Sequence, residues 1–215
     1  MFWNTVSDRL RSTLIVIMDK PLFDPFRLVG GTSLSLQLGH RVSDDIDLFT
    51  DLPYETIDLM SIETWFRNKF PLVESGHAPV MGMGHSFFVG NNTEDQVKVD
   101  VYHTDPFIRP ALVVNGVRMA GLEDIAAMKL DIVGRGVGSG GRMKDFWDLH
   151  ALLDRYTIPQ MLDFYGECYP YGHSREEIIG GLKDFSVADD DFHPNCLLGK
   201  HWELIKLDMV RIEDR

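Results

Sequence analysis

The chain has 215 residues, enough for one large domain or two small ones with a substantial hydrophobic core. With 44% hydrophobic and 25% charged residues, its composition is that of an ordinary globular protein, and the early apolar run TLIVIM falls far short of the roughly 20 residues of a membrane span. The formal net charge of -12 argues against a broad basic surface for sequence-independent nucleic-acid binding, but it is compatible with a local basic patch and with recruitment of divalent cations.

Two further features bear on the cellular compartment. Cys168 and Cys196 are too few for a disulfide framework and lack metal-ligand spacing. No small-residue cleavage site follows the early apolar run, so a secretory signal is not expected. We therefore expect a reduced, cytoplasmic protein with no membrane association.

The first half of the chain predicts a mixture of helices and strands. Apolar residues at helical spacing predict helices over 5–18 and 54–70. Asn115-Gly116 is a hairpin signal inside the last of several β-rich runs. Short apolar or alternating runs predict strands at 26–29, 45–49, 86–90, 96–103 and 111–120.

The second half reads as helical. A glycine-rich loop, GRGVGSGG at 134–141, separates its first two helices and is expected to be mobile. The fold class is therefore α+β, with a mixed half over 1–121 and a helical half over 122–215 that share one cleft. The predicted helices are 122–133, 143–155, 158–168, 174–184 and 200–214.

Paired acids stand in an otherwise buried strand, DIDLF. Asp45 and Asp47 point to the same face, roughly 7 Å apart, and two carboxylates at that distance repel by about 2.4 kcal/mol at an effective dielectric near 20. A divalent cation such as Mg²⁺ would remove this repulsion, and Asp100 in VKVDVYH is a third acid on the polar face of a strand. If the two strands are neighbours, three carboxylates converge as a two-metal phosphoryl-transfer site requires. The alternative is a solvated or salt-bridged strand end.

Gly30-Gly31 precedes this strand and allows two structures. Thr32 or Ser33 could cap a helix whose free N–H groups hold a phosphate. The alternation of leucines with polar residues over 33–38 instead favours a strand, with the two glycines forming a hairpin turn. The pattern alone leaves both open.

The ordered set of Gly-Gly-Thr, Asp-Ile-Asp and a later strand aspartate resembles the DNA polymerase β-type nucleotidyltransferases. GGTSLSLQLGHRVSDDIDLF, EDIAAMKL and RMKDFWDLHALL resemble motifs of the AbiEii/AbiGii abortive-infection toxin family of that superfamily. The resemblance implies a polymerase β-like core with a mixed sheet flanked by helices, a helical segment at 33–39, and Mg²⁺ or Mn²⁺ held by Asp45, Asp47 and Asp100. It leaves open which of Gly30, Gly31, Thr32 and Ser33 contacts phosphate.

Charged residues of the helical half have two interpretations each. Lys129 lies on the buried stripe of its helix and so needs an anion, either an internal salt bridge or, as the resemblance implies, the nucleotide. Lys144 and Asp148 form an ordinary surface pair by spacing, whereas the resemblance places Lys144, Asp145 and Asp148 in the cleft, with Asp145 as a general base. Arg135 and Arg142 flank the glycine-rich loop and are either surface residues or phosphate and RNA contacts.

The resemblance implies an enzyme that transfers NMP from an NTP to an acceptor hydroxyl, with a tRNA 3′ end as the acceptor, growth arrest as the result and a cognate antitoxin as partner. Two alternatives stay open: a nucleotide-binding module without turnover, and a small-molecule nucleotidyltransferase of the antibiotic-modifying type. His40, His103 and His150 share no zinc-ligand spacing and are expected to be structural or exposed.

Overall fold

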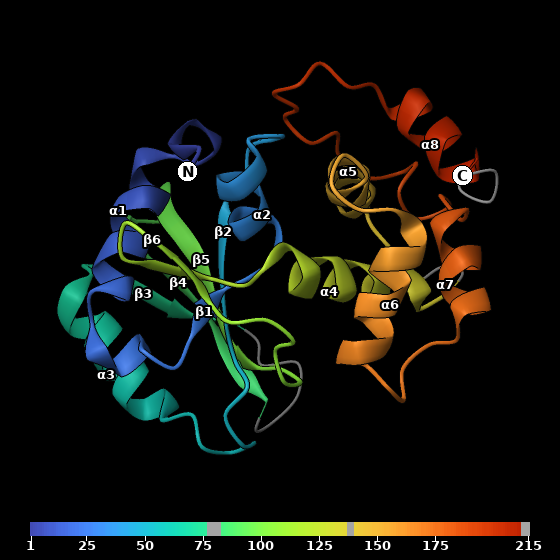
Figure 1. Ribbon diagram of the computed structural model, residues 1–215. Coiled ribbons are helices and arrows are strands. Elements are labelled where there is room, and N and C mark those ends of the chain that lie inside the picture. The colour runs from blue at the N-terminus through green and yellow to red at the C-terminus, as the bar shows by residue number, and fades with distance from the viewer. Residues whose placement is uncertain (77–82, 137–139, 212–215) are drawn as a thin grey trace.

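Figure 1 shows the computed structural model of the chain, which describes residues 1–76, 83–136 and 140–211. Within these residues the strands form one seven-stranded mixed sheet in the order β3-β4-β5-β2-β1-β7-β6. The central pair, β2 and β5, is parallel, and β4 runs antiparallel to β5. The strands are β1 (Arg27–Leu28), β2 (Asp45–Thr50), β3 (Leu72–Ser75), β4 (Gly84–Asn92), β5 (Asp95–His103), β6 (Leu112–Val114) and β7 (Val117–Met119).

The helices begin at polar caps where the sequence supplies them. The Ser7 hydroxyl accepts from Leu10 N, and Thr157 and Ser174 form capping boxes with Gln160 and Glu177. The α-helices are α1 (Asp8–Met18), α2 (Gly30–Leu38), α3 (Leu59–Lys69), α4 (Leu122–Gly134), α5 (Met143–Leu152), α6 (Ile158–Cys168), α7 (Arg175–Leu182) and α8 (Trp202–Val210), with short 3-10 turns at Trp3–Thr5 and Pro21–Phe23.

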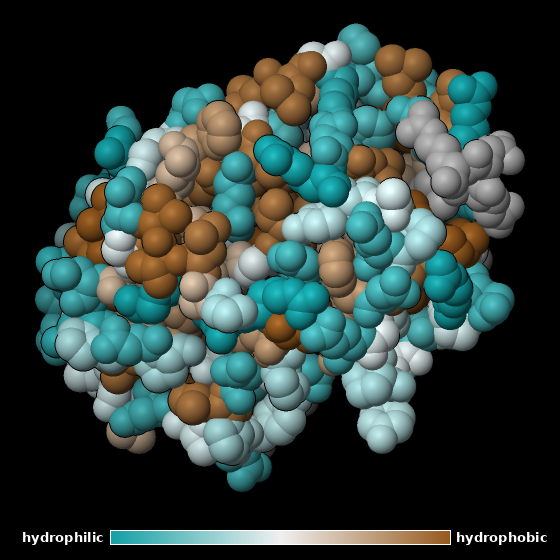
Figure 2. Space-filling model, in the orientation of Figure 1, coloured by the Kyte–Doolittle hydropathy of each residue, from teal (hydrophilic) through white to brown (hydrophobic). Residues whose placement is uncertain are grey.

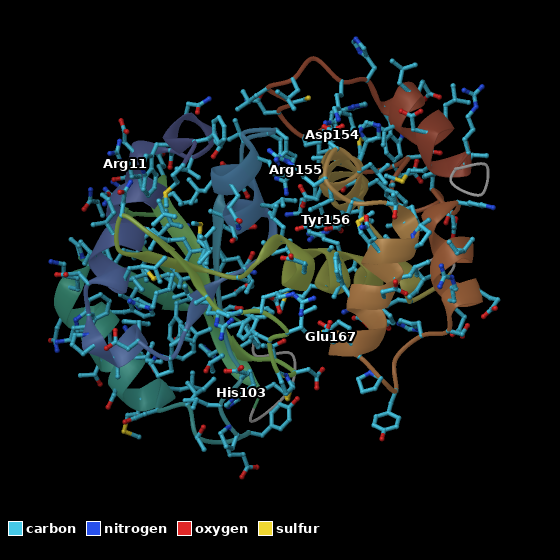
Figure 3. The ribbon with its side chains drawn as sticks, viewed as in Figure 1. Arg11, His103, Asp154, Arg155, Tyr156 and Glu167 are labelled. Carbon is cyan, nitrogen blue, oxygen red and sulfur yellow. The ribbon has the colours of Figure 1, made fainter. Side chains whose placement is uncertain are left out.

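The two faces of the sheet differ because β2, and β5 from Gln96 onward, alternate between buried and partly exposed residues. Ile46 and Leu48 of β2 pack with Val99 of β5 against apolar side chains of α1 and α3. The opposite face, which carries the acids, is turned toward the helical half, so the sheet lies between two helical layers (Figure 1). Arg11 on α1 and Glu167 on α6 accordingly lie on opposite sides of the sheet (Figure 3).

The helical half has its own apolar core, in which Leu130 of α4, Phe146 of α5 and Trp202 of α8 are buried together. Helix α2 joins the two halves, because its Leu34 packs in this core while its Leu36 packs in the core of the sheet. None of the described helices combines the length and apolar character that a membrane span requires. The face in Figure 2 is largely hydrophilic, with hydrophobic residues in small groups.

Most predicted elements are present, with shifted ends. The helix predicted from residue 54 begins at Leu59, and the strand at 72–75 was not predicted. The hairpin at Asn115-Gly116 is confirmed, since both residues have a positive φ, 52° and 82°. Part of the glycine-rich loop (137–139) and the end of the last predicted helix (212–215) lie outside the described residues.

The strand interpretation of residues 33–38 is wrong, because these residues lie in α2, as the family resemblance implies. Ser33, Leu34, Ser35 and Leu36 are all buried, so polarity here does not separate an inner from an outer face. The expected capping role of Thr32 or Ser33 is also wrong, because the helix starts earlier, at Gly30, with Val29 at its N-cap.

Candidate active site

Helix α2 begins directly beside the acidic strand. The first bond of its N-terminal turn runs from Ser33 N to Val29 O at 3.3 Å, so the N–H groups of Gly30 and Gly31 precede it. Gly30 has a φ of +66°, and a side-chain carbon there would collide with the Asp47 carboxylate. A side chain at Gly31 would collide with the Arg41 guanidinium. The two glycines therefore let an acid and a base approach the positive end of the helix.

The two acidic strands are neighbours, which is the condition for the three acids to converge. Asp47 of β2 is the register partner of Asp100 of β5, and adjacent strands lie about 5 Å apart. Residues in register share a face, and Asp45 lies two residues before Asp47 on the same face. We call Asp45, Asp47 and Asp100 the carboxylate cluster.

The cluster carries more negative charge than its surroundings neutralise. Burial, together with the carboxylates of Asp100 and Asp45, raises the pKa of Asp47 to about 7, although Lys129 and Lys98 act in the opposite direction. Two lysines lie against the cluster: Lys98 Nζ is 2.6 Å from Asp100 Oδ2, and Lys144 Nζ is 3.8 Å from Asp45 Oδ2. Carboxylates held this close favour a further cation.

The cluster fits a divalent cation in its donors and its charge. Asp100 Oδ1 is buried and has no hydrogen-bond partner among the described residues, an arrangement that costs free energy unless a cation or a hydroxyl occupies it. Hard cations prefer carboxylate oxygens of this kind. As the side chains stand, no group of three or more Asp, Glu, His or Cys residues in the described part of the chain is arranged to hold a metal ion.

A second group of charges lies between α5 and the segment that follows α2. Asp148 is fully buried, and its oxygens lie 2.7 Å from His40 Nε2, 2.7 and 2.8 Å from Arg41 Nε and Nη2, and 2.6 Å from Lys129 Nζ. Burial alone would raise the pKa of Asp148, but Arg41, Lys129 and the His40 bond hold it well below its usual value. We call His40, Arg41, Lys129, Asp145 and Asp148 the buried ion network.

Asp145 belongs to this network and is unsuited to the predicted role of general base. Its Oδ1 accepts from Lys129 Nζ at 2.7 Å, and its Oδ2 accepts from Arg142 N at 3.0 Å. Burial acts to raise the pKa of Asp145, but Lys129 lowers it. Asp145 and Asp148 in turn raise the pKa of Lys129, although burial acts to lower it. A buried acid with occupied oxygens and a lowered pKa is a poor proton acceptor. Its geometry is that of a residue that positions Lys129.

One cavity joins the two groups, with the carboxylate cluster on its sheet side and cations on its helical side. Thr32, Ser33 and Asp148, which the sequence places in the nucleotide site, do not line it. Thr32 Oγ1 instead bonds Ser43 Oγ at 2.8 Å and Asp45 O at 2.5 Å, and so fixes α2 to β2. Predicted residues that line the cavity are Gly30, Gly31, Asp45, Asp47, Asp100, Lys129, Lys144 and Asp145.

The cavity also contains residues to which the sequence assigned no role. Arg41 and Lys98 line it, and each is paired with an aspartate. Arg41 stands inside the motif GHRVSDDID and Lys98 alternates with Asp100, so a basic residue a few positions before the acids of each strand was the available signal. Arg142 lines the cavity as well, whereas Arg135 pairs with Asp131 at 3.3 Å.

The three histidines have structural partners. His40 belongs to the buried ion network. His103 Nδ1 lies 3.1 Å from Leu52 O, and His150 lies between Asp208 and Lys200.

Comparisons with known proteins find relatives in sequence and in fold. A relative from Aquifex aeolicus (strain VF5), the uncharacterized protein aq_aa25, is 29% identical over 157 residues, which is 68% of this chain and 66%, just under two thirds, of the relative. A crystal structure of a putative nucleotidyltransferase from H. pylori is similar in fold, with a TM-score of 0.59, 19% identity, and coverage of 97% of this chain and 94% of that one. So is MenT4, the nucleotidyltransferase toxin Rv2826c from Mycobacterium tuberculosis H37Rv, with a TM-score of 0.61, 14% identity, and coverage of 95% and 82%.

The match to a family model decides the family. The model described as nucleotidyl transferase AbiEii toxin, Type IV TA system, matches residues 14–212, nearly the whole chain and every element of the cavity. The chain belongs to the AbiEii family of nucleotidyl transferase toxins.

Proposed function

We propose that this protein transfers NMP from an NTP to an acceptor hydroxyl, using Mg²⁺ or Mn²⁺ bound by Asp45, Asp47 and Asp100. One observation carries the proposal: Asp47 and Asp100 lie in register on adjacent parallel strands, beside the N-terminus of α2 and opposite a set of cations in one cavity. Family membership and the toxin fold of MenT4 support the same chemistry.

The divalent ion, when bound, neutralises phosphate charge and makes the acceptor hydroxyl a better nucleophile. The first N–H groups of α2 and the Arg41 guanidinium lie where they can bind triphosphate oxygens, and Lys144 adds a further positive charge. Lys129 lines the same cavity and is fixed by Asp145 and Asp148. The acceptor oxygen bonds to the α-phosphorus, the bond to the β-phosphate oxygen breaks, pyrophosphate leaves, and the hydroxyl proton passes to water.

The acceptor that we propose is a tRNA 3′ end, with growth arrest in the cytoplasm as the consequence and a cognate antitoxin as the partner. The family description, a nucleotidyl transferase toxin of a Type IV TA system, supports the growth arrest and the antitoxin, and the neighbour MenT4 is likewise a nucleotidyltransferase toxin. The acidic chain needs only a local contact with such an acceptor, because the cavity itself is lined by Arg41, Lys98, Arg142 and Lys144.

The test incubates the protein with each α-labelled NTP in turn, Mg²⁺ and total tRNA. We expect labelled tRNA from the wild type and at least about a hundredfold less from Asp47→Asn, because loss of a metal carboxylate removes several kcal/mol of transition-state stabilisation. Asp163→Asn, which changes an exposed acid on α6, is the matched control and should label as the wild type does.

Equal labelling by wild type and Asp47→Asn would contradict the proposal. NTP binding in a calorimeter without any label transfer would favour the binding module. Transfer to an aminoglycoside but not to tRNA would favour a small-molecule nucleotidyltransferase.

A further inference from the structure

A second cavity adjoins the candidate active site on the same face of the sheet. Its described lining includes Phe88 and Tyr102, which do not line the first cavity. The two cavities share Phe49, Lys98 and Asp100. They therefore meet at the carboxylate whose Oδ1 has no partner among the described residues.

Aromatic rings form the floor of this second cavity. Tyr102 and Phe49 are register partners two residues beyond the Asp100–Asp47 pair, on the same face of the sheet. Their ring centroids are 6.1 Å apart, with the ring planes at 63°. The Tyr102 hydroxyl lies 3.1 Å from Ser86 Oγ on the neighbouring strand. Gly84, the register partner of Tyr102 on β4, has no side chain to cover the ring. All three aromatic side chains, including Phe88, are partly exposed.

The charge of the described lining of the second cavity does not favour a polycationic acceptor. Among its described lining residues the charged ones are Lys98 and Asp100, and these pair with each other at 2.6 Å. A polycationic acceptor such as an aminoglycoside would need several unpaired acids here. A nearly neutral floor of aromatic rings instead suits a nucleobase, since a base stacked on an aromatic ring gains about 1–3 kcal/mol.

The spacing also matches a nucleotide. Asp100 and Tyr102 are two residues apart on one strand, so their side chains emerge about 6.5–7 Å apart on the same face. The ribose ring of a nucleotide separates its hydroxyl from its base by a similar span. A base on Tyr102 thus places a ribose hydroxyl near Asp100 Oδ1, with the triphosphate-binding cations on the other side.

We propose that this second cavity is the acceptor subsite, where the terminal nucleobase of an RNA acceptor stacks on Tyr102 while its ribose hydroxyl lies beside Asp100. This inference rests on the proposed function, because it assigns the acceptor side of the same reaction. It makes RNA with an intact terminal base the preferred acceptor class.

The test measures binding rather than turnover. Fluorescence anisotropy reports the affinity for a labelled, short single-stranded RNA ending in CCA, and for the same RNA with an abasic terminal residue. We expect Tyr102→Leu, which keeps apolar volume but removes the ring, to weaken binding of the intact RNA about tenfold or more. Tyr102→Phe should recover most of that loss. Tyr171→Leu is the control, because Tyr171 is fully exposed and lines neither of these cavities.

Two further measurements sharpen the result. The affinity of a non-hydrolysable NTP should be the same in wild type and Tyr102→Leu, since Tyr102 does not line the first cavity. The abasic RNA should bind the wild type as weakly as Tyr102→Leu binds the intact RNA, and it should not respond to the substitution.

Three outcomes would overturn the subsite: equal binding of intact and abasic RNA, loss of NTP affinity in Tyr102→Leu, or no RNA binding by a wild type that binds NTP. The failures are separable from those of the proposed function. RNA binding that depends on the Tyr102 ring but is not followed by label transfer would contradict the proposed activity and support the subsite. Label transfer to tRNA that does not depend on this ring would support the activity and contradict the subsite.

Discussion

The protein contains two groups of aspartates within one cavity region, and their electrostatic states are opposite. In the carboxylate cluster burial and the neighbouring acids outweigh the nearby lysines, so the pKa of Asp47 is raised to about 7. In the buried ion network the cations surround the acids, so the pKa values of Asp145 and Asp148 are lowered. The same residue type is thus available for an incoming cation in one place and fixed as a structural anion in the other.

The motif residues of the two groups also have different roles. The carboxylate cluster lies on strands whose opposite faces are anchored in the core, so its acids are positioned without being neutralised. The buried ion network joins Arg41, which follows α2, to Asp148 on α5, and so ties the helical half to the sheet half while it presents Arg41 and Lys129 to the cavity. Substitutions should therefore change activity in one group and stability in the other.

The largest expected effect on stability is in Asp148→Asn. Removing this charge leaves Arg41 and Lys129 buried with too little negative charge, which typically costs about 3–5 kcal/mol. Urea denaturation measures the free energy of unfolding, and Asp163→Asn should change it by less than about 0.5 kcal/mol. A loss of similar size in Asp47→Asn would remove the distinction between the two groups.

Gly30→Ala should have the next largest effect. Its φ of +66° disfavours a side chain by about 1–2 kcal/mol, and the new carbon collides with Asp47, so both stability and label transfer should fall. Gly166→Ala is the matched control in α6, where nothing lies within 4 Å of the added carbon and helix propensity favours alanine. If Gly30→Ala has the melting temperature and the label transfer of the wild type, the close approach of Asp47 to the N-terminus of α2 is not required.

Removal of divalent cation should destabilise the wild type but not Asp47→Asn. At a Mg²⁺ concentration ten times its dissociation constant, binding to the native state adds about 1.4 kcal/mol. Thermal melts in Mg²⁺ and in EDTA measure the difference. An equal shift in the two proteins would place the cation somewhere other than the carboxylate cluster.

The smallest expected effect is in the pH dependence of stability, because Asp47 is partly exposed. In EDTA, between about pH 4 and 7 the native state holds a proton on Asp47 that the unfolded state has lost, so stability should fall as pH rises. Below about pH 4 the lowered pKa values of Asp145 and Asp148 act in the opposite sense, so stability should fall as pH decreases toward those values.

Urea denaturation across this range separates the two contributions. Asp47→Asn should flatten the slope between about pH 4 and 7, and Asp148→Asn should weaken the acid-side decline. A slope between about pH 4 and 7 that survives Asp47→Asn would assign it to another group.

Local patterns in the sequence determined much of the fold. Alternation in DIDLF and VKVDVYH placed the acids on one face of two strands, because the period of two fixes the direction of each side chain. Helical periodicity placed Lys129 on a buried stripe, where its charge requires an anionic partner. Asn115-Gly116 specified its hairpin, because both positions require a positive φ.

Tertiary contacts decided the rest. Residues 33–38 alternate like a strand but form a helix, because α2 is buried on several sides and its serines need not face solvent. The anion for Lys129 proved to be internal, and Arg41 reached Asp148 across 107 positions. Short-range periodicity carries no information about which distant residues meet, so the register of Asp47 with Asp100, the buried ion network and the adjoining aromatic cavity emerged only when the chain was folded.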